Sequence, residues 1–538
     1  MKEKIQLVIE EVIRKVLNLE NIKVEVMIPK DPINGDYSTP VALSLAKKVD
    51  MGSIELANLL KDAIDDEIFV KIEVKQPGFL NFFVKKDYLF ENMYRVLSLK
   101  EKYGSSNFGN NEKINLEYVS ANPTGTLHLG HARGAAYGDS LARILSFAGF
   151  DVTREYYIND AGNQMMNLAK SIKARYLEAC HMECEFPEDG YHGPEIINLG
   201  NSLFNEYQDS KVNEDSSYFK EIGLTFLMDQ IKKDLADFRV SFDVFTSETS
   251  LYDRGLVKDA VSKLTEEGYT YQEDGATFLK TTLFGDSKDR VLVKQDGAYT
   301  YLVPDIAYHK NKYSRGFFKL IDVLGADHHG YIPRLKASIQ MMNEDPSKLE
   351  VKIIQMVRLI KNGEELKMSK RTGNAITIQE LTDEIGVDAA RYFFSNRSID
   401  TMMDLDIDLA LKKSNDNPVY YVNYAHARCS TILNEYSNIT LDVNTFDTLN
   451  SVDAYNVLTK VYSFPEIVQK AAVLGEVHLI TNYAYELASL FHTFYAKEKI
   501  IKDDNLVYTK EHLAFIKAVQ ITLFNALQLI GVEAYKSM

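Results

Sequence analysis

The most regular hydrophobic pattern in the chain is a strand-like stretch that leads into a helical one. Over residues 114–118 apolar and polar side chains alternate, which predicts a strand with one buried face. Pro123 and Gly125 then interrupt the pattern. Apolar or aromatic side chains recur afterwards along one helical stripe, at Tyr137, Leu141, Ile144, Leu145 and Ala148. We therefore expect a strand, a Pro/Gly turn and a long helix in succession.

Residues 1–90 carry the patterns of a small α/β domain. A helical stripe runs from Ile5 to Val16, and residues 24–27 are typical of a strand. A helical pattern follows through residues 43–46, and residues 80–84 alternate as in a second strand. We interpret this region as a separate N-terminal domain.

Between residues 111 and 408, strands and helices alternate as in a doubly wound parallel sheet of the Rossmann type. Ligands of such sheets bind beyond the carboxyl ends of the strands. Three predicted strands end in polar loops: 114–118 at 120–125, 299–303 at 304–305, and 320–324 at 325–330. An insertion with its own helices, including one at 226–238, is expected at about 155–289.

From residue 414 to 538 the pattern is entirely helical. Apolar stripes over 487–494 and 515–527 indicate the core of a helical bundle. The predicted fold class is therefore α/β, with a small N-terminal α/β domain, a doubly wound parallel-sheet domain and an all-α C-terminal bundle. A chain of 538 residues is too long for one hydrophobic core, which agrees with three parts.

Composition changes this picture little. Hydrophobic residues make up 45% of the chain and charged residues 26%, as in ordinary soluble globular proteins. No apolar run approaches the length of a membrane span, and the first residues lack the layout of a signal peptide, so we expect a cytoplasmic protein. The formal net charge of −16 argues mildly against nucleic acid as a partner, although net charge does not say where basic residues lie.

The three cysteines are too few for a disulfide framework, which suits a reducing compartment. Cys180 and Cys184, with His181 between them, resemble half of a metal site. Because two further cysteines are missing nearby, we interpret 180–184 as a helical stretch with reduced thiols and expect no structural metal.

The predicted turn before the long helix carries candidate chemistry. A helix N-terminus leaves backbone N–H groups unpaired and carries partial positive charge, so it attracts phosphate. His128 and His131 lie there, and Gly130 leaves room for a flat group against the backbone. By itself the pair is also typical of capping or surface residues, and a zinc site would need further ligands.

A second candidate element lies far downstream. After an apolar run at 351–356 and a hairpin signal at Asn362-Gly363 comes the sequence Lys-Met-Ser-Lys-Arg-Thr-Gly-Asn over residues 367–374. Two lysines and an arginine on a short loop suit a polyphosphate whose charge moves during a reaction. Taken alone, a solvated basic loop is the simpler interpretation.

The two elements in this order resemble the class I aminoacyl-tRNA synthetases, with His128-Leu-Gly-His131 as the HIGH motif and Lys367-Met-Ser-Lys-Arg371 as the KMSKS motif. Arg371 stands where that motif has its final serine. Further stretches narrow the resemblance to the arginyl-tRNA synthetases over nearly the whole chain: 120–125, 274–277, 289–293, 324–331, 417–422 and 424–428.

The resemblance implies an enzyme that activates L-arginine with ATP and Mg²⁺ and transfers it to tRNA(Arg). Positioning and charge stabilisation would do most of the chemistry, so the candidate catalytic residues act on phosphate charge: His128, His131, Lys367 and Lys370. The expected ATP-binding residues are Thr124, Gly125, His128, Gly130, His131, Met368, Ser369 and Lys370.

The substrate's guanidinium group calls for carboxylates, which bind it through paired hydrogen bonds. Asp305, with Tyr301 four residues before it, is the first candidate, and Glu248 is the second. The resemblance also places Glu117 and Asn122 near the α-amino group, and the loop 327–329, which includes Asp327, near arginine or ATP. Ser120 is a further expected arginine-binding residue.

In the resembled family the N-terminal domain contacts the outer corner of tRNA and the C-terminal domain reads the anticodon. Tyr420, Tyr424 and Arg428 carry aromatic and basic groups that could stack on bases or bind phosphate, and helix packing is the alternative for the tyrosines. We expect a monomer.

Two other functions compete with this interpretation. A small-molecule nucleotidylyltransferase shares the His-x-Gly-His turn, but it leaves the lysine loop and the helical C-terminal part unexplained. A catalytically silent tRNA-binding relative is the other alternative. The presence of both histidines and both lysines argues against it.

Overall fold

The computed structural model describes residues 2–27, 29, 31–366 and 375–538. Its contacts divide the chain into two compact units. The first comprises residues 1–100, 437–462 and 499–518, and the second comprises residues 101–436, 463–498 and 519–538.

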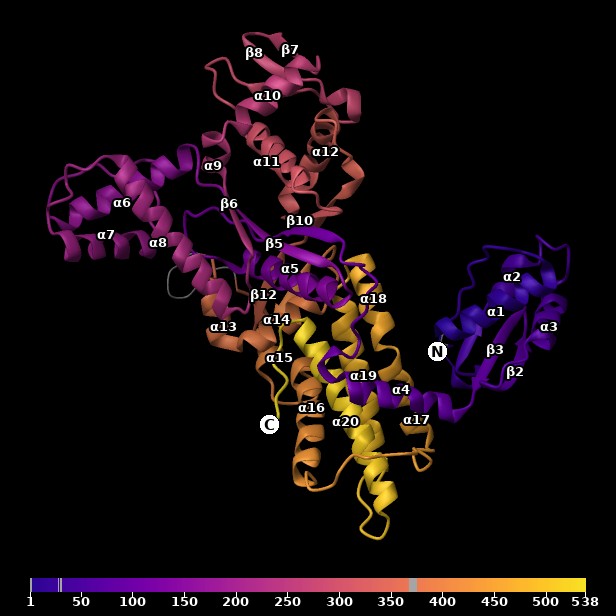
Figure 1. Cartoon of the computed structure of the whole chain (residues 1–538). Helices are drawn as coiled ribbons and strands as arrows, with labels where there is room; N and C mark the ends of the chain where they lie inside the picture. The colour runs from indigo at the N-terminus through magenta and orange to yellow at the C-terminus, as the bar shows by residue number, and fades with distance from the viewer. Residues whose placement is uncertain (1, 28, 30, 367–374) are drawn as a thin grey trace. The chain divides into compact units, whose positions relative to one another are not determined.

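The first unit contains the predicted N-terminal α/β domain. An antiparallel sheet has the strand order β1-β3-β2, with β1 (Tyr37–Thr39), β2 (Phe69–Lys75) and β3 (Phe79–Val84). It packs against the helices α1 (Lys2–Leu17), α2 (Val41–Leu45) and α3 (Ser53–Ala63) (Figure 1). The strand expected at 24–27 is wrong, because within that stretch only Met27 pairs, in an isolated bridge with Ser38. The unit continues through α4 (Lys86–Leu99) and α17 (Val452–Tyr462).

The second unit is built on a five-stranded parallel sheet of order β11-β10-β4-β5-β6. Its strands are β4 (Lys113–Glu117), β5 (Asp151–Ile158), β6 (Val244–Ser247), β10 (Lys319–Gly325) and β11 (Leu349–Ile354). From β4 the chain runs outward to β5 and β6, and then returns to β10 on the other side of β4. The topological switch point, where ligands of such sheets bind, therefore lies between β4 and β10.

The strand β4 is buried on both faces, which corrects the expectation of a single buried face. Asn115 and Glu117 were expected to face solvent, yet they are 0% and 6% exposed. The reason is the parallel sheet itself, whose connecting helices cover both faces. Helix α5 (Leu129–Phe147) follows β4 as predicted and packs against β4, β5 and β10. The polar face of β4 must consequently find partners inside the protein.

The segment between β5 and β6 forms a small helical group with a core of its own. Helices α6 (Asn163–Ala179), α7 (Pro194–Tyr207) and α8 (Ser216–Asp237) pack together (Figure 1). Because β6 belongs to the main sheet, this strand interrupts the insertion expected at 155–289. Helix α6 ends at Ala179, so Cys180–Cys184 follows the helix, and its placement on a helical stretch was wrong.

After β6 come further elements: α9 (Glu248–Asp253), α10 (Leu256–Glu266), β7 (Thr270–Glu273), β8 (Ala276–Leu279) and β9 (Arg290–Val293), the strands forming a small antiparallel sheet. The strand expected at 299–303 is wrong, because α11 (Leu302–Ser314) begins inside it. Pro304 lies in the first turn of α11, where a missing N–H group is tolerated. Asp305 therefore lies on a helix and not at a strand end.

A sheet of order β13-β12-β14 follows α12 (Ile332–Met341). Strands β12 (Val357–Lys361) and β13 (Glu364–Glu365) are joined by Asn362 and Gly363, both at positive φ, which confirms the predicted hairpin. The remaining elements up to the bundle are α13 (Ile378–Ile385), α14 (Val387–Ser395), β14 (Met403–Asp406) and α15 (Ile407–Leu411).

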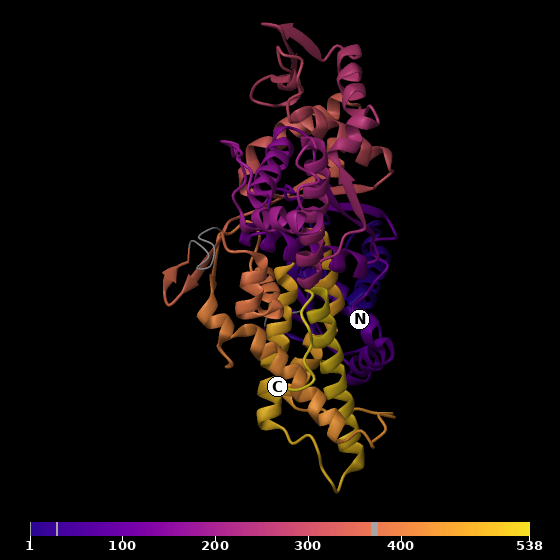
Figure 2. The same ribbon diagram turned by 90° about the vertical axis from the view of Figure 1, so that its left-hand side faces the viewer.

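The C-terminal part is helical, as predicted. Its helices are α16 (Pro418–Glu435), α18 (Phe464–Leu474), α19 (His478–Lys497) and α20 (Leu506–Leu529). Helices α16 and α19 lie side by side, and their orange and yellow ribbons remain adjacent in the rotated view (Figure 2). The predicted apolar stripes supply buried side chains, including Leu487, Phe491, Leu523 and Leu527.

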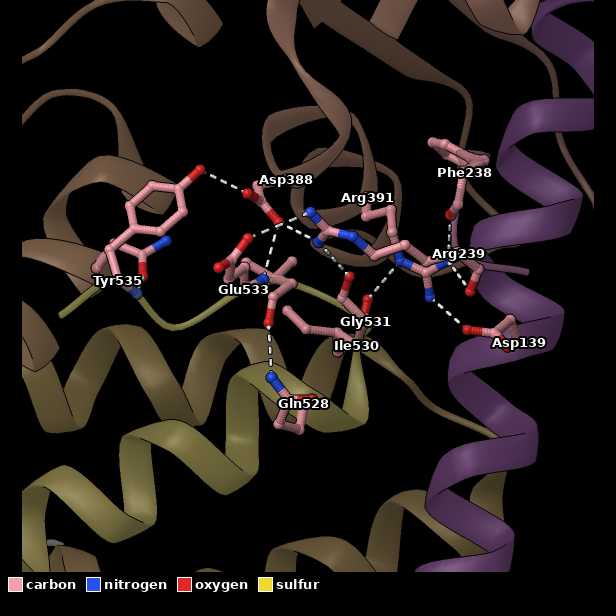
Figure 3. Close-up of polar contacts among 12 residues, drawn as sticks. Asp139, Phe238, Arg239, Asp388, Arg391, Gln528, Ile530, Gly531, Glu533 and Tyr535 are labelled. Carbon is pink, nitrogen blue, oxygen red and sulfur yellow. Dashed lines mark hydrogen bonds and ion pairs between the residues drawn. The ribbon is translucent and has the colours of Figure 1, made fainter. Parts of the chain in front are cut away.

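The buried side chain of Arg391 links the segment after α20 to helix α5, which packs on the five-stranded sheet (Figure 3). Arg391 of α14 is fully buried, and its Nη2 donates to Asp139 Oδ2 of α5 at 2.6 Å. The same guanidinium donates to the carbonyl oxygens of Phe238 and Ile530, both at 2.9 Å. A buried cation with a paired carboxylate and satisfied donors is stable only when this geometry is kept. Arg391 therefore ties the segment after α20 to α5 and α14.

A substitution at Gly531 would test the contacts of Arg391. The φ of Gly531 is +66°, and an added Cβ would lie 2.3 Å from Arg391 Nη2. We expect Gly531→Ala to destabilise the protein by about 3 kcal/mol, because it adds displacement of a buried ion pair to backbone strain. Gly316 is the matched control, with φ +76° and open space around the added Cβ, so Gly316→Ala should lose only about 1 kcal/mol. Urea unfolding of both variants measures the difference, and equal losses would contradict the displacement.

Candidate active site

The turn after β4 is held in an unusual backbone conformation. Val119 and Ser120 have φ values of +69° and +38°, and a β-branched residue rarely adopts such a conformation. Strain of this kind costs about 1–3 kcal/mol and gathers at functional sites. The Ser120 hydroxyl donates to Glu117 Oε1 at 2.9 Å and accepts from the backbone N–H of Tyr157 at 3.0 Å. These contacts fix the turn between β4 and β5.

The two histidines of the predicted HIGH motif lie at the start of α5, as expected. His128 is the N-cap residue, and its Nδ1 accepts from the backbone N–H of Gly130 at 3.1 Å. The Nδ1 of His131 accepts from the backbone N–H of His128 at 3.2 Å, and the ring centroids are 3.9 Å apart. A Cβ on Gly130 would lie 3.0 Å from the His128 ring, so a larger residue here would crowd that ring.

These hydrogen bonds determine where the histidine protons lie. Because Nδ1 of each ring accepts a backbone N–H, the neutral rings carry their protons on Nε2. Burial lowers the pKa of His128, and burial together with His128 lowers the pKa of His131 to about 4. Both rings are therefore neutral near pH 7, and each keeps one Nε2–H donor that the helix cap does not use.

The segment that follows the lysine loop pairs with this turn. His128 and Thr377 form an antiparallel bridge, and the backbone N–H of Leu129 donates to Ile376 O at 2.9 Å. On the other side, Ile378 N–H donates to Leu127 O at 3.0 Å. The predicted residues Lys367, Met368, Ser369 and Lys370 lie outside the described residues.

Two carboxylates predicted to bind the guanidinium group come together near the switch point. Glu248, the first residue of α9, is 6% exposed and accepts from the Tyr157 hydroxyl at 3.0 Å. Asp305 is half-buried and accepts from the Tyr331 hydroxyl. Burial, and after it the charges of Asp305 and Asp160, raise the pKa of Glu248 to about 7 against the lowering effect of the hydrogen bond from Tyr157. Burial also raises the pKa of Asp305.

This environment disfavours two negative charges, and a bound cation would relieve it. The arrangement therefore suits a ligand with a planar cationic end, because a guanidinium offers several N–H donors to two carboxylates at once.

Sequence patterns missed a buried ionic cluster beside this pair. Lys312 of α11 bonds to Glu117 and to Asp322 of β10, and His309 bonds to Asp322 through Nε2 at 2.7 Å. The spacing of Asp305, His309 and Lys312 is that of one helical face. Sequence patterns do not reveal this face, because they predict a strand at the start of α11 and because charged residues are usually exposed.

Three other predicted arginine-binding residues, Tyr301, Asp327 and Asn122, are exposed, unlike Glu248. Tyr301 is 72% exposed at the start of α11, and Tyr331, not Tyr301, donates to Asp305. The side chain of Asp327 is 83% exposed in the short helix η4 (Ala326–Tyr331) after β10. Asn122 is exposed and donates to Gln164 Oε1 at 3.0 Å. Of the expected ATP-binding residues, Thr124 and Gly125 are half-buried in the turn before α5.

The residues predicted to bind tRNA share one face of α16. The rings of Tyr420 and Tyr424 are stacked with centroids 6.1 Å apart. The Arg428 guanidinium lies 4.5 Å from the ring centroids of both Tyr424 and Tyr495, and it donates to the Tyr424 hydroxyl at 2.8 Å. All three predicted residues are half-buried, so this face combines packing with partial exposure.

Among the residues that the structure describes, no group of three or more His, Cys, Asp or Glu side chains is placed to hold a metal ion. Within the same residues, no helix has both the length and the apolar character needed to cross a membrane.

A Rossmann-type parallel sheet carries a His-x-Gly-His turn at its switch point. Residues 92–428 match the family model described as tRNA synthetases class I (R), catalytic domain, which identifies a class I aminoacyl-tRNA synthetase. Residues 3–84 match the arginyl tRNA synthetase N-terminal domain, and residues 422–538 match the DALR anticodon binding domain. The chain belongs to the arginyl-tRNA synthetase family.

Relatives and solved structures agree with this assignment. The chain is 52% identical over 524 residues to the arginine–tRNA ligase of Geobacillus kaustophilus, covering 95% of this chain and 94% of the relative. It is 51% identical over 520 residues to the Bacillus subtilis enzyme of the same name, covering 95% and 93%. The chain is therefore an ATP-dependent arginine–tRNA ligase, with arginine, ATP and tRNA as substrates.

Solved structures share the fold. A Campylobacter jejuni structure titled as a putative arginyl-tRNA synthetase matches with a TM-score of 0.78 at 35% identity, covering 85% of this chain and 100% of that one. The Thermus thermophilus arginyl-tRNA synthetase matches with a TM-score of 0.78 at 17% identity, covering 100% of both chains, which supports the fold alone. The fold class expected from the sequence is confirmed.

Proposed function

We propose that Glu248 and Asp305 bind the guanidinium group of arginine. The observation that carries this role is the pair of carboxylates with raised pKa values, each held by a tyrosine hydroxyl. A site built for charged hydrogen bonds rejects an analogue that leaves its carboxylates unpaired, by about 10⁴-fold in comparable cases. We assign the α-amino end of the substrate to Glu117, Ser120 and Asn122. A role in arginine binding stays a prediction for the exposed residues Tyr301 and Asp327.

The same proposal gives the histidines an electrostatic role in adenylate formation. The arginine carboxylate oxygen attacks the α-phosphorus of ATP, the bond to the bridging oxygen breaks, and pyrophosphate leaves. The Nε2–H groups of His128 and His131 are neutral donors at a helix N-terminus, where phosphate charge is stabilised. Lys367 and Lys370 are assigned to the pyrophosphate charge from the motif alone. Mg²⁺, carried on the ATP phosphates, would neutralise part of the same charge.

In the second step, the arginyl group passes from the adenylate to the terminal ribose 2′-OH of tRNA(Arg), and AMP leaves. We assign Tyr420, Tyr424 and Arg428 to tRNA, because half-exposed aromatic rings and a guanidinium suit unpaired bases and phosphate. We also propose that the protein acts as a monomer in the cytoplasm, where reduced Cys180 and Cys184 would persist.

Arginine-dependent exchange of pyrophosphate into ATP tests the substrate and the first step together. The assay is run with and without tRNA(Arg), and lysine and citrulline serve as controls. We expect exchange with arginine only, since lysine lacks the planar fork and citrulline lacks the charge. Equal exchange with citrulline would overturn the role of the carboxylate pair.

Arginine binding should depend on pH through Glu248. The carboxyl must be ionised to pair with the guanidinium, and its pKa is raised to about 7 by burial. Below pH 7 the group is protonated, so we expect KM for arginine to rise by up to about tenfold per pH unit between pH 7 and 5. Steady-state kinetics across this range measure the effect. Glu248→Gln removes the titrating group, and an unchanged profile in this variant would assign the dependence elsewhere.

A further inference from the structure

The buried Lys312 connects the two ends of the proposed arginine site through one helix. Asp305, His309 and Lys312 lie at positions i, i+4 and i+7 of α11, and therefore on one face. Asp305 is assigned to the guanidinium end of the substrate. Lys312, two turns further along, is 0% exposed and bonds to Glu117, which is assigned to the α-amino end.

Both oxygens of Glu117 are engaged. Oε1 accepts from the Ser120 hydroxyl at 2.9 Å, and Oε2 pairs with Lys312 Nζ. Since one contact comes from the turn after β4 and the other from α11, the carboxylate has little freedom to rotate. Glu117 is also opposite Asp322 in the pairing of β4 with β10, at the switch point of the sheet.

Lys312 is in turn held in place from the other side. Its Nζ donates to Asp322 Oδ1 at 2.8 Å and lies 4.4 Å from the centroid of the Tyr308 ring. Asp322 Oδ2 bonds to His309 Nε2 at 2.7 Å, and His309 Nδ1 is 2.8 Å from the carbonyl oxygen of Asp305. These contacts form a continuous series from Asp305 through His309, Asp322 and Lys312 to Glu117.

The charges explain why Lys312 is needed. Glu117 and Asp322 are 6% and 2% exposed, and two buried carboxylates side by side repel one another. Burial opposes the charged form of Lys312, but Asp322 and Glu117 outweigh it and raise its pKa above the ordinary value. The pKa of Asp322 is lowered, because Lys312 and His309 outweigh its burial. Lys312 thus favours the ionised form of Asp322 and pairs with Glu117 at the same time.

We propose that Lys312 is a positioning residue for arginine. It holds the Glu117 carboxylate in place, and through α11 it sets the distance between Glu117 and the carboxylate pair at the guanidinium end. This role rests on the proposed assignment of Glu117 to the α-amino group. Lys312 itself touches no substrate.

The test uses Lys312→Met in the full chain, with arginine and des-amino arginine (5-guanidinopentanoic acid) as ligands. We expect KM for arginine to rise about 10- to 100-fold, in the range produced by misplacing a binding group, while KM for ATP stays within about twofold. The inhibition constant of des-amino arginine should also stay within about twofold, because that ligand does not use Glu117. Equal weakening of both guanidinium ligands would indicate general damage and overturn the proposal.

Lys310→Met is the matched control. Lys310 lies on the same helix and pairs with Glu344, but its side chain is 34% exposed and faces away from the cluster. We expect its kinetics to match the unaltered enzyme. A loss for arginine in Lys310→Met as large as in Lys312→Met would overturn a specific role for Lys312.

A double-mutant cycle tests the role of Lys312 separately from the assignment of Glu117 to the α-amino group. If Lys312 acts through Glu117, the double variant Glu117→Gln with Lys312→Met should bind arginine no worse than Glu117→Gln alone. An additive loss overturns the positioning role. An unchanged KM in Glu117→Gln overturns the assignment of Glu117 itself. If Lys312→Met does not fold, the double variant still decides, because it leaves no unpaired charge at residue 117 and Asp322 keeps His309 as a partner.

Discussion

Replacement of His128 by asparagine is expected to lower the rate of arginyl-adenylate formation by about 10²- to 10³-fold without unfolding the protein, as loss of one charge-stabilising donor does elsewhere. Asparagine is a good N-cap residue, and its side-chain oxygen can accept from the backbone N–H of Gly130 as His128 Nδ1 does. It has no donor in the position of Nε2. The variant therefore separates the capping role of His128 from its proposed role toward phosphate.

Pre-steady-state measurement of adenylate formation, with arginine and tRNA both saturating, gives the rate directly. The melting temperature is the control for the helix cap. His131→Ala should reduce the rate similarly, since His131 also carries an Nε2–H donor beside His128. An unchanged rate in His128→Asn or in His131→Ala would reduce that histidine to a structural residue.

The elements that sequence patterns predicted are those in which local and tertiary preferences agree. The strand at 114–118, its turn and the helix after it follow from hydrophobic spacing and from proline and glycine. The hairpin at Asn362-Gly363 follows because both residues tolerate positive φ. For His128 and His131, the sequence indicates a helix N-terminus. The hydrogen bonds to Nδ1 in the structure further indicate that the neutral rings carry their protons on Nε2.

The start of α11 could not be predicted in the same way. Residues 299–303 are aromatic or β-branched apart from Leu302, which favours a strand over a short window. The helix forms because Leu302, Val303 and Ile306 are buried in the core of this region, and burial outweighs propensity. A strand predicted over these residues conceals the helical face that carries Asp305 and Lys312.

The buried charges were out of reach for a related reason. A lone lysine or aspartate in a sequence is most often exposed, and its partner can be distant in the chain. Lys312 meets Glu117 across 195 residues, and Arg391 meets Asp139 across 252. Only the strand order of the sheet and the packing of α14 on α5 bring these groups together. Such pairs are properties of the fold, and no local pattern encodes them.

The largest loss of arginine binding is expected from Asp305→Asn. Removing one charge from a buried, hydrogen-bonded pair typically costs about 2–5 kcal/mol, so KM for arginine should rise about 30- to 5,000-fold. The preference for arginine over citrulline should fall as well, because an amide no longer requires a charged partner. Asp253→Asn is the matched control, since Asp253 is exposed at the end of α9. Steady-state kinetics with both amino acids measure the two effects.

The same substitution should change stability in the opposite direction. Without arginine, the ionised carboxyl of Asp305 is disfavoured by burial and repels Glu248, so its removal relieves both. We therefore expect Asp305→Asn to melt at a higher temperature than the unaltered protein when arginine is absent, and to lose the stabilisation that arginine provides. A lower melting temperature together with an unchanged KM would mean that Asp305 supports the fold and does not bind the substrate. Opposite signs for binding and stability are the signature of a carboxylate kept for its ligand, because a structural ion pair loses stability when one partner is removed.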